Sequence, residues 1–98
     1  MASEAEIKAE MKAYIDKHGG PDSSWYAGIA ADPKDRLFSD HGVDKDNGAW
    51  IFHTSSTADE ARRVEKYLIA LGCDGGGGGG DAATKAIYAY KKTPNTDP

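Results

Sequence analysis

The residues of this chain that could do chemistry gather between positions 25 and 41. Tyr26 opens a short apolar stretch, and Arg36 and His41 follow a proline at position 33. An arginine presents a fixed fork of donors that suits phosphate oxygens, and a histidine can move a proton near neutral pH. This set favours chemistry on an anionic group. The alternative is a solvated helix face, with Arg36 paired to a nearby aspartate and His41 capping the helix end.

Two further candidates lie later in the chain. Glu65 stands at the margin of an apolar stripe in a helix expected at 58–71, where a carboxylate can face a cleft between helix and sheet or belong to an ordinary surface. Tyr88 belongs to the last expected strand, 86–92. Zinc binding is not indicated, because the histidines and the cysteine are scattered singles without the short spacing of a zinc site.

Helix caps, hydrophobic spacing and turn residues predict the elements that must position these side chains. Capping-box patterns begin at Ser3 and Thr57, and Asp32 with Pro33 starts the helix that carries Arg36. The expected order is a helix after Ser3, a strand at 24–31, a helix from 33, a strand at 49–54, a helix at 58–71 and a strand at 86–92. This order predicts an α+β fold in which a small three-stranded antiparallel sheet is covered by about three helices.

Length and composition indicate one soluble domain. The 98 residues can form a single core, expected at about 3–92, with a polar tail at 93–98. The glycine run 75–80 is read either as a flexible connection or as a loop packed on the active face. Cys73 is the sole cysteine, so no internal disulfide can form, and we expect a cytoplasmic protein without a membrane segment.

The formal net charge of −4 counts against a general nucleic-acid binder. A local basic face remains open, since several cations fall in the C-terminal half. These are Arg62, Arg63, Lys66, Lys85, Lys91 and Lys92. Nucleic acid is therefore expected only on a restricted face, and a protein partner or a homo-oligomer is an alternative.

A tyrosine and a glycine on a strand, an arginine about eight residues later on a helix, and a histidine at the helix end together resemble the second half of the GIY-YIG nuclease domain. Tyr26, Gly28, Arg36 and His41 carry the pattern, and Glu65 falls in the following helix, where that family has its metal-binding glutamate. The resemblance spans roughly residues 25–72.

One motif of the family is missing, because no Gly-Ile-Tyr strand precedes Tyr26. The Ala-Ile-Tyr at 86–88 resembles it, and a permuted connection would place that strand beside the Tyr26 strand. The glycine run would supply the slack. A last strand that lay away from the Tyr26 strand would exclude this arrangement.

The resemblance implies phosphodiester cleavage with Mg²⁺ or another divalent metal. Tyr26 or Tyr88 would help to activate water, Arg36 would stabilise charge on the phosphate, His41 would relay a proton, and Glu65 would bind the metal. A free tyrosine is a poor base at pH 7 and needs a nearby positive charge. Two hypotheses follow: a metal-dependent nuclease, or a catalytically inactive relative that binds protein or nucleic acid.

Overall fold

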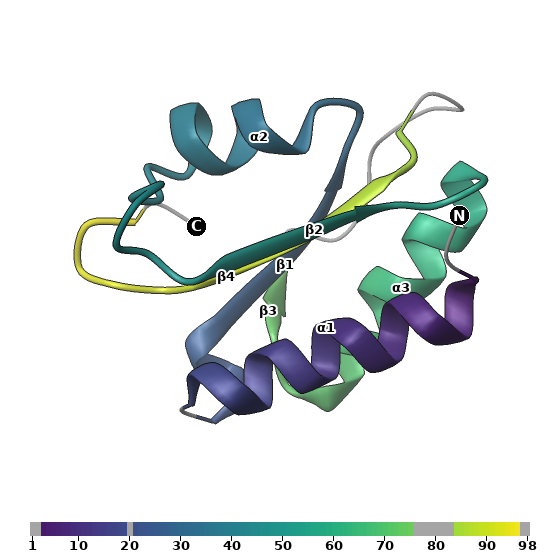
Figure 1. Cartoon of the computed structure of the whole chain (residues 1–98), viewed down its shortest axis with the longest axis horizontal. Helices are drawn as coiled ribbons and strands as arrows, with labels where there is room; N and C mark the ends of the chain where they lie inside the picture. Colours follow the sequence, from purple (N-terminus) through teal and green to yellow (C-terminus); the bar gives the residue numbers. More distant parts are fainter. Residues whose placement is uncertain (1–2, 20, 76–83, 97–98) are drawn as a thin grey trace.

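A computed structural model of the chain describes residues 3–19, 21–75 and 84–96. Three helical segments and a four-stranded sheet make up the fold (Figure 1). In chain order they are α1 (Glu4–His18), a short 3₁₀ turn η1 (Asp22–Ser24), β1 (Trp25–Ala30), α2 (Pro33–Asp35) continued by η2 (Arg36–Asp40), β2 (Trp50–Thr54), α3 (Ala58–Leu71), β3 (Asp74–Gly75) and β4 (Ala86–Lys91).

The helix starts follow the caps that the sequence predicts. Ser3 forms a complete capping box with Glu6 at the start of α1. The side chain of Thr57 accepts from the backbone N–H of Glu60 and begins α3. The reciprocal half of this second box differs from the prediction, since the Glu60 carboxylate accepts from the N–H of Ser56 at 3.2 Å.

The strand order is β2-β4-β1-β3, and the sheet is mixed. β4 pairs antiparallel with both β1 and β2, whereas β3 pairs parallel with β1. The predicted three-stranded antiparallel sheet is therefore wrong. The three predicted strands are present as β1, β2 and β4, and β4 is antiparallel to both of the others. β3 adds a fourth strand, which is parallel to β1.

The short strand escaped prediction for a physical reason. β3 has two residues, Asp74 and Gly75, which pair with Tyr26 and Ala27. Neither residue type favours a strand, and two residues cannot show an alternating pattern. The pairing arises because α3 packs against β1 and its exit brings the chain to the open edge of that strand. The rest of the predicted glycine loop, 76–80, lies outside the described residues.

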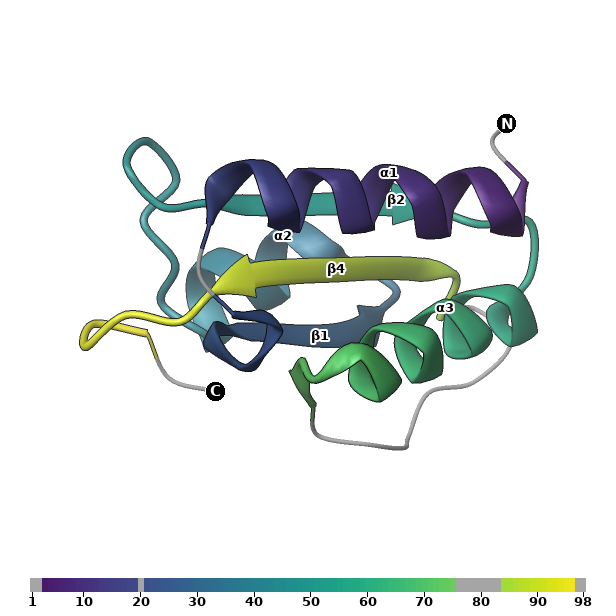
Figure 2. The same cartoon turned by 90° about the horizontal axis from the view of Figure 1, so that it is seen from below.

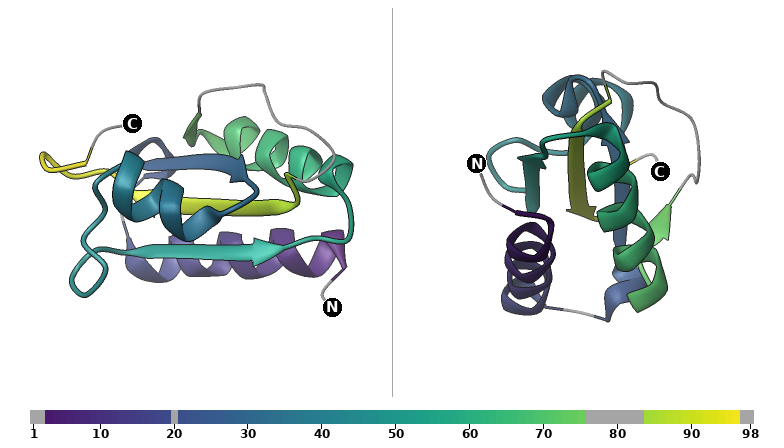
Figure 3. Two further views of the ribbon diagram at one scale, coloured as in Figure 1. Left: turned by 90° about the horizontal axis from the view of Figure 1, so that it is seen from above. Right: turned by 90° about the vertical axis from the view of Figure 1, so that its right-hand side faces the viewer.

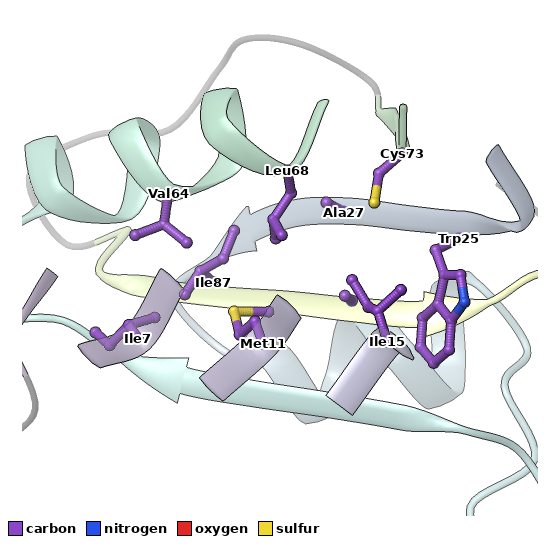
Figure 4. Close-up of a cluster of buried hydrophobic side chains, with 10 residues drawn as sticks. Ile7, Met11, Ile15, Trp25, Ala27, Val64, Leu68, Cys73 and Ile87 are labelled. Carbon is purple, nitrogen blue, oxygen red and sulfur yellow. The ribbon is translucent and has the colours of Figure 1, made fainter. Parts of the chain in front are cut away.

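The sheet separates two cores of different chemistry. α1 and α3 cover one face, and α2 with η2 covers the other (Figures 2 and 3). Figure 4 shows the aliphatic core beneath α1 and α3, where Ile7, Met11 and Leu68 meet Ile87 of β4. The second core is largely aromatic and contains Tyr88 and Tyr90.

The two helices that build the aliphatic core present mainly apolar side chains to it. α1 buries one side chain per turn from Ile7 to Ile15, and α3 buries Val64 and Leu68 at the same spacing. None of the helices in the described part of the chain combines the length and the apolarity that a membrane span requires.

Candidate functional site

The alternation of β1 and β4 places three tyrosines on the face beneath α2 and η2. Tyr26 pairs with Tyr90, and Gly28 pairs with Tyr88. Side chains of paired residues lie on the same face of a sheet. The Tyr26 and Tyr90 rings stack with centroids 5.4 Å apart. The last strand thus lies directly beside the Tyr26 strand, as the permuted arrangement requires.

Gly28 makes room for the Tyr88 ring. A Cβ atom at position 28 would lie 2.5 Å from the Tyr88 hydroxyl oxygen and 2.6 Å from Cζ. Tyr88 therefore occupies the space where any other residue would carry its side chain. This close approach explains why a glycine interrupts an otherwise well-formed strand.

A short helical segment brings Arg36 and His41 over these tyrosines. Asp32 caps α2 and Pro33 opens it, as predicted. The following turn is wide, because the N–H of His41 bonds to the carbonyl of Arg36 at 2.9 Å, five residues back. Leu37 anchors this turn in the aromatic core. Wide turns of this kind redirect side chains and recur at functional sites.

His41 is buried between two phenols, with 6% of its surface exposed. Its Nε2 lies 2.7 Å from the hydroxyl of Tyr88, and its Nδ1 lies 3.1 Å from the hydroxyl of Tyr90. The Tyr26 ring packs against the imidazole with centroids 4.9 Å apart. Both ring nitrogens are therefore occupied, and the imidazole plane is held from several sides.

Arg36 approaches the same phenol from solvent. Its guanidinium interacts with the Tyr88 hydroxyl and forms an ion pair with Asp40 at 3.3 Å. Half of the Arg36 side chain is exposed, at 51%. The predicted pairing with an aspartate is present, but Arg36 faces Tyr88 as well. Arg36 is therefore a solvent-exposed cation at this site.

The Tyr88 phenol is not poised to act as a phenolate. Burial raises its pKa above the ordinary tyrosine value, and Arg36 only partly opposes this effect. A tyrosine that acts as a base needs a nearby cation to lower its pKa, and Tyr88 does not meet this requirement. A neutral phenol can still donate to His41 and accept from a proton donor, so a relay role remains.

Glu65 is buried on α3, with 5% of its surface exposed. Burial raises the pKa of its carboxyl group, and the nearby Arg62 and Lys66 oppose this shift. Glu65 belongs to α3, which covers the sheet face opposite α2 (Figure 3). Its negative charge nevertheless contributes to the raised pKa of Tyr88.

The positive charges of Arg62 and Lys66 lie near the Glu65 carboxylate. Every fully buried side-chain nitrogen or oxygen in the described residues has a hydrogen-bond partner. A magnesium-like ion often takes one or two carboxylates and completes its shell with water and phosphate. Glu65 could supply one such carboxylate. The described residues contain no cluster of three or more ligating side chains.

A pocket of about 200 Å³ lies next to this region but outside the cluster. The turn at 42–48, Lys91 and the turn at 93–96 line it. None of the tyrosines, and neither Arg36 nor His41, contributes to its wall. The chemistry of the cluster is therefore not housed in this pocket.

The structure brings together Tyr26, Arg36, His41 and Tyr88, and the charge of Glu65 acts on this cluster through Tyr88. Sequence reasoning missed Tyr90, whose hydroxyl contacts His41. The signal was available, because Tyr90 stands two residues after Tyr88 on a strand and must share its face.

Comparison of the chain with protein-family models, with curated proteins and with solved structures finds no match in any of the three.

Proposed function

We propose that the tyrosine, arginine and histidine cluster, together with Glu65, forms a phosphodiester-cleaving site of GIY-YIG type. The observation that carries this proposal is the convergence of Arg36 and His41, at the two ends of the η2 turn, on Tyr88 of β4. The adjacent placement of β4 and β1 supports it, since it sets the Ala-Ile-Tyr strand beside Tyr26.

Arg36 supplies the phosphate contact. It is the exposed cation of the cluster, and its donors can hold charge that develops on phosphate oxygens. Tyr26 is half-buried and lies against His41, so it can border the same phosphate. Lys34 and Lys45 add positive charge on this face, where each lies over an aromatic ring.

Proton transfer runs through Tyr88 and His41. When a proton reaches the Tyr88 oxygen, Tyr88 gives its own proton to Nε2 of His41, which lies 2.7 Å away. The phenol stays neutral throughout, which agrees with its raised pKa. Glu65 would hold Mg²⁺ or a similar ion, which when bound neutralises charge on the leaving oxygen.

A second function is favoured by the burial of the cluster. Tyr88 is 1% exposed and His41 is 6% exposed. A sealed cluster beneath an exposed arginine also suits an inactive relative that binds protein or nucleic acid. In either case we assign the protein to a reducing cytoplasmic compartment, because Cys73 has no disulfide partner in the chain.

Cleavage of single- and double-stranded DNA and RNA with Mg²⁺ or Mn²⁺ tests the first function. Glu65→Gln and Arg36→Ala should each abolish cleavage. Glu10→Gln and Arg63→Ala are matched controls, because they alter an exposed glutamate and an exposed arginine on α1 and α3. Loss in all four variants would show that the effect is not specific to the site.

Metal titration by calorimetry separates the two functions. The nuclease predicts heat of Mg²⁺ binding that disappears in Glu65→Gln. Absence of both cleavage and metal binding, with nucleic acid or a protein partner still bound in an Arg36-dependent manner, would support the binding module and refute the enzyme.

A further inference from the structure

Strand β2 carries an aromatic strip at one edge of the sheet. None of the residues of this edge strand is buried, whereas β4 beside it is buried along nearly its whole length. Trp50 pairs with Tyr90 and Phe52 pairs with Tyr88, so both rings lie on the face covered by α2 and η2. The aromatic strip, defined as Phe38, Trp50 and Phe52, therefore continues the surface of the tyrosine cluster to the edge.

The rings of the aromatic strip are held in place. Trp50 and Phe52 are nearly parallel, with an interplanar angle of 6° and centroids 6.3 Å apart. The Phe38 ring packs edge-on against Trp50 with centroids 5.0 Å apart. The indole N–H of Trp50 donates to the carbonyl of Lys45 at 3.1 Å, and its backbone N–H donates to the hydroxyl of Tyr14 at 3.0 Å. A ligand that stacks on these rings therefore meets a preorganised surface, which lowers the entropic cost of binding.

Three cations border the aromatic strip. The Nζ atom of Lys34 lies 5.9 Å from the centre of the Phe52 ring, and that of Lys45 lies 6.0 Å from the centre of the Phe38 ring. Arg36 belongs to the same turn as Phe38 and is exposed. A lysine on an aromatic face can turn toward a phosphate, because its ammonium group ends a flexible stem. Rings and cations that lie side by side in this way suit a ligand made of bases and phosphates.

The aspartates of the same region limit what the phosphates can contribute to binding. Five aspartates fall between positions 32 and 46, against the three cations, so this stretch carries no net positive charge. Asp32 and Asp44 accept backbone N–H groups, and Asp40 pairs with Arg36. Affinity for a nucleic acid must therefore come mainly from stacking on the rings.

Stacking on a protein requires bases whose faces are free. A duplex packs its base faces against one another, whereas a single strand can offer them to aromatic side chains. We propose that the aromatic strip binds single-stranded nucleic acid, with bases stacked on Trp50 and Phe52 and phosphates held by Lys34 and Lys45. Because the strip shares its sheet face with the tyrosine cluster, single strands are also the substrate class of the phosphodiester site. That last step rests on the proposed function, whereas the binding does not.

Fluorescence anisotropy of a labelled DNA strand of about 12 nucleotides measures the binding, with EDTA present so that no metal-dependent cleavage occurs. The same sequence as a duplex, and thymidine monophosphate as a competitor, are the other two ligands. We expect the single strand to bind at least about 10-fold more tightly than either of them, since it alone can stack two bases at once. Equal affinity for the duplex or for the mononucleotide, or no binding of the single strand, would overturn the proposal.

Leucine variants remove the aromatic faces and keep apolar bulk. Trp50→Leu and Phe52→Leu should each raise Kd for the single strand by about 5- to 150-fold, the usual effect of losing one stacked base. Tyr67→Leu is the matched control, because Tyr67 is a half-buried ring with Lys8 5.3 Å from its centre, on the sheet face opposite α2. Urea unfolding shows whether each variant is folded. An equal loss in Tyr67→Leu, or no loss in Phe52→Leu, would refute binding on the strip.

Salt dependence reports on the phosphates, and it leaves the rings untouched. The logarithm of the association constant should fall against the logarithm of the salt concentration with a slope no steeper than about −2, because each of three cations contributes about −0.7 on a single strand. Exposed Lys34→Gln should make this slope shallower by about 0.7, whereas Lys8→Gln should not change it. A much steeper slope, or no change in Lys34→Gln, would place the strand on other cations and overturn the proposal.

Cleavage assays and light scattering separate the remaining outcomes. If binding depends on Phe52 and no strand is cut, the nuclease proposal fails and the binding surface stands. If single strands and duplexes are cut equally well, and Phe52→Leu cuts both like the wild type, the nuclease stands and the strip is not its substrate surface. A dimer that forms without nucleic acid and dissociates in Phe52→Leu would assign the strip to self-association and overturn the proposal.

Discussion

Gly28→Ala is the sharpest test of how this sheet accommodates its aromatic face. The added methyl group would stand 2.6 Å from Cζ of Tyr88 and 2.5 Å from its hydroxyl oxygen. Ordinary contact between carbon atoms begins near 3.5 Å, so the ring must retreat by about 1 Å. Such a shift also strains the 2.7 Å hydrogen bond to His41.

Three effects set the size of the change. Overpacking a well-filled core costs about 1–3 kcal/mol, and weakening a buried hydrogen bond adds about 0.5–1.5 kcal/mol. Alanine recovers about 0.5–1 kcal/mol, because glycine loses more backbone entropy in a strand. We therefore expect Gly28→Ala to lower the free energy of unfolding by about 1–3 kcal/mol.

A double-mutant cycle with Tyr88→Val isolates the contact. Valine suits a strand and removes the ring atoms that oppose position 28. In that background Gly28→Ala should be neutral or stabilising by up to about 1 kcal/mol. Urea unfolding followed by tryptophan fluorescence measures all four proteins, and buried Trp25 serves as the reporter. Equal costs in the two backgrounds would refute the steric argument.

Three further perturbations test the burial, capping and reactivity that the structure assigns. Glu65→Gln should raise the free energy of unfolding at pH 7 but not at pH 4. Burial raises the pKa of the Glu65 carboxyl group, so its contribution to stability is present below the ordinary glutamate pKa and is lost as the pH rises through the pKa of the folded state. Urea unfolding at both pH values checks this, and a destabilised variant at pH 7 would contradict it. Thr57→Ala should lower the free energy of unfolding by about 1 kcal/mol, because it removes the cap of α3. In the same urea experiment, exposed Ser39→Ala should change the free energy of unfolding by less than about 0.5 kcal/mol. Burial raises the pKa of Cys73 from 9.0 to about 11, so a coloured thiol reagent at pH 8 should modify the native protein much more slowly than the urea-unfolded chain; similar rates would show that the thiol is accessible.

Local signals were enough to predict the long elements. Ser3 and Thr57 cap the two main helices, and the spacing of Ile7, Met11 and Ile15 identifies the buried side of α1. Two leading aromatic residues mark β1, and aromatic residues in alternation mark β2 and β4. These features depend only on short stretches of sequence, so they can be recognised without knowledge of the tertiary fold.

The parts that could not be predicted depend on packing between distant segments. β3 exists because the exit of α3 reaches the edge of β1, and Asp74 with Gly75 has no strand preference of its own. The helical period places Glu65 near the buried stripe but does not say which face of the sheet its helix covers. The grouping of Arg36 with Tyr88 likewise depends on the pairing of Gly28 with Tyr88, a contact between residues 60 positions apart.

The contrast between the two sheet faces carries the functional argument. An aliphatic core such as that beneath α1 and α3 stabilises a sheet without polar atoms to satisfy. The opposite face instead buries an imidazole and two phenolic hydroxyls, each of which must keep its hydrogen bonds to avoid a desolvation penalty. It also places a glycine in β1 so that the Tyr88 ring can lie on the backbone. Stability alone is served better by apolar side chains at these positions. The polar cluster of buried His41, Tyr88 and Tyr90 beneath exposed Arg36 therefore calls for an explanation beyond stability, and the proposed phosphodiester site offers one.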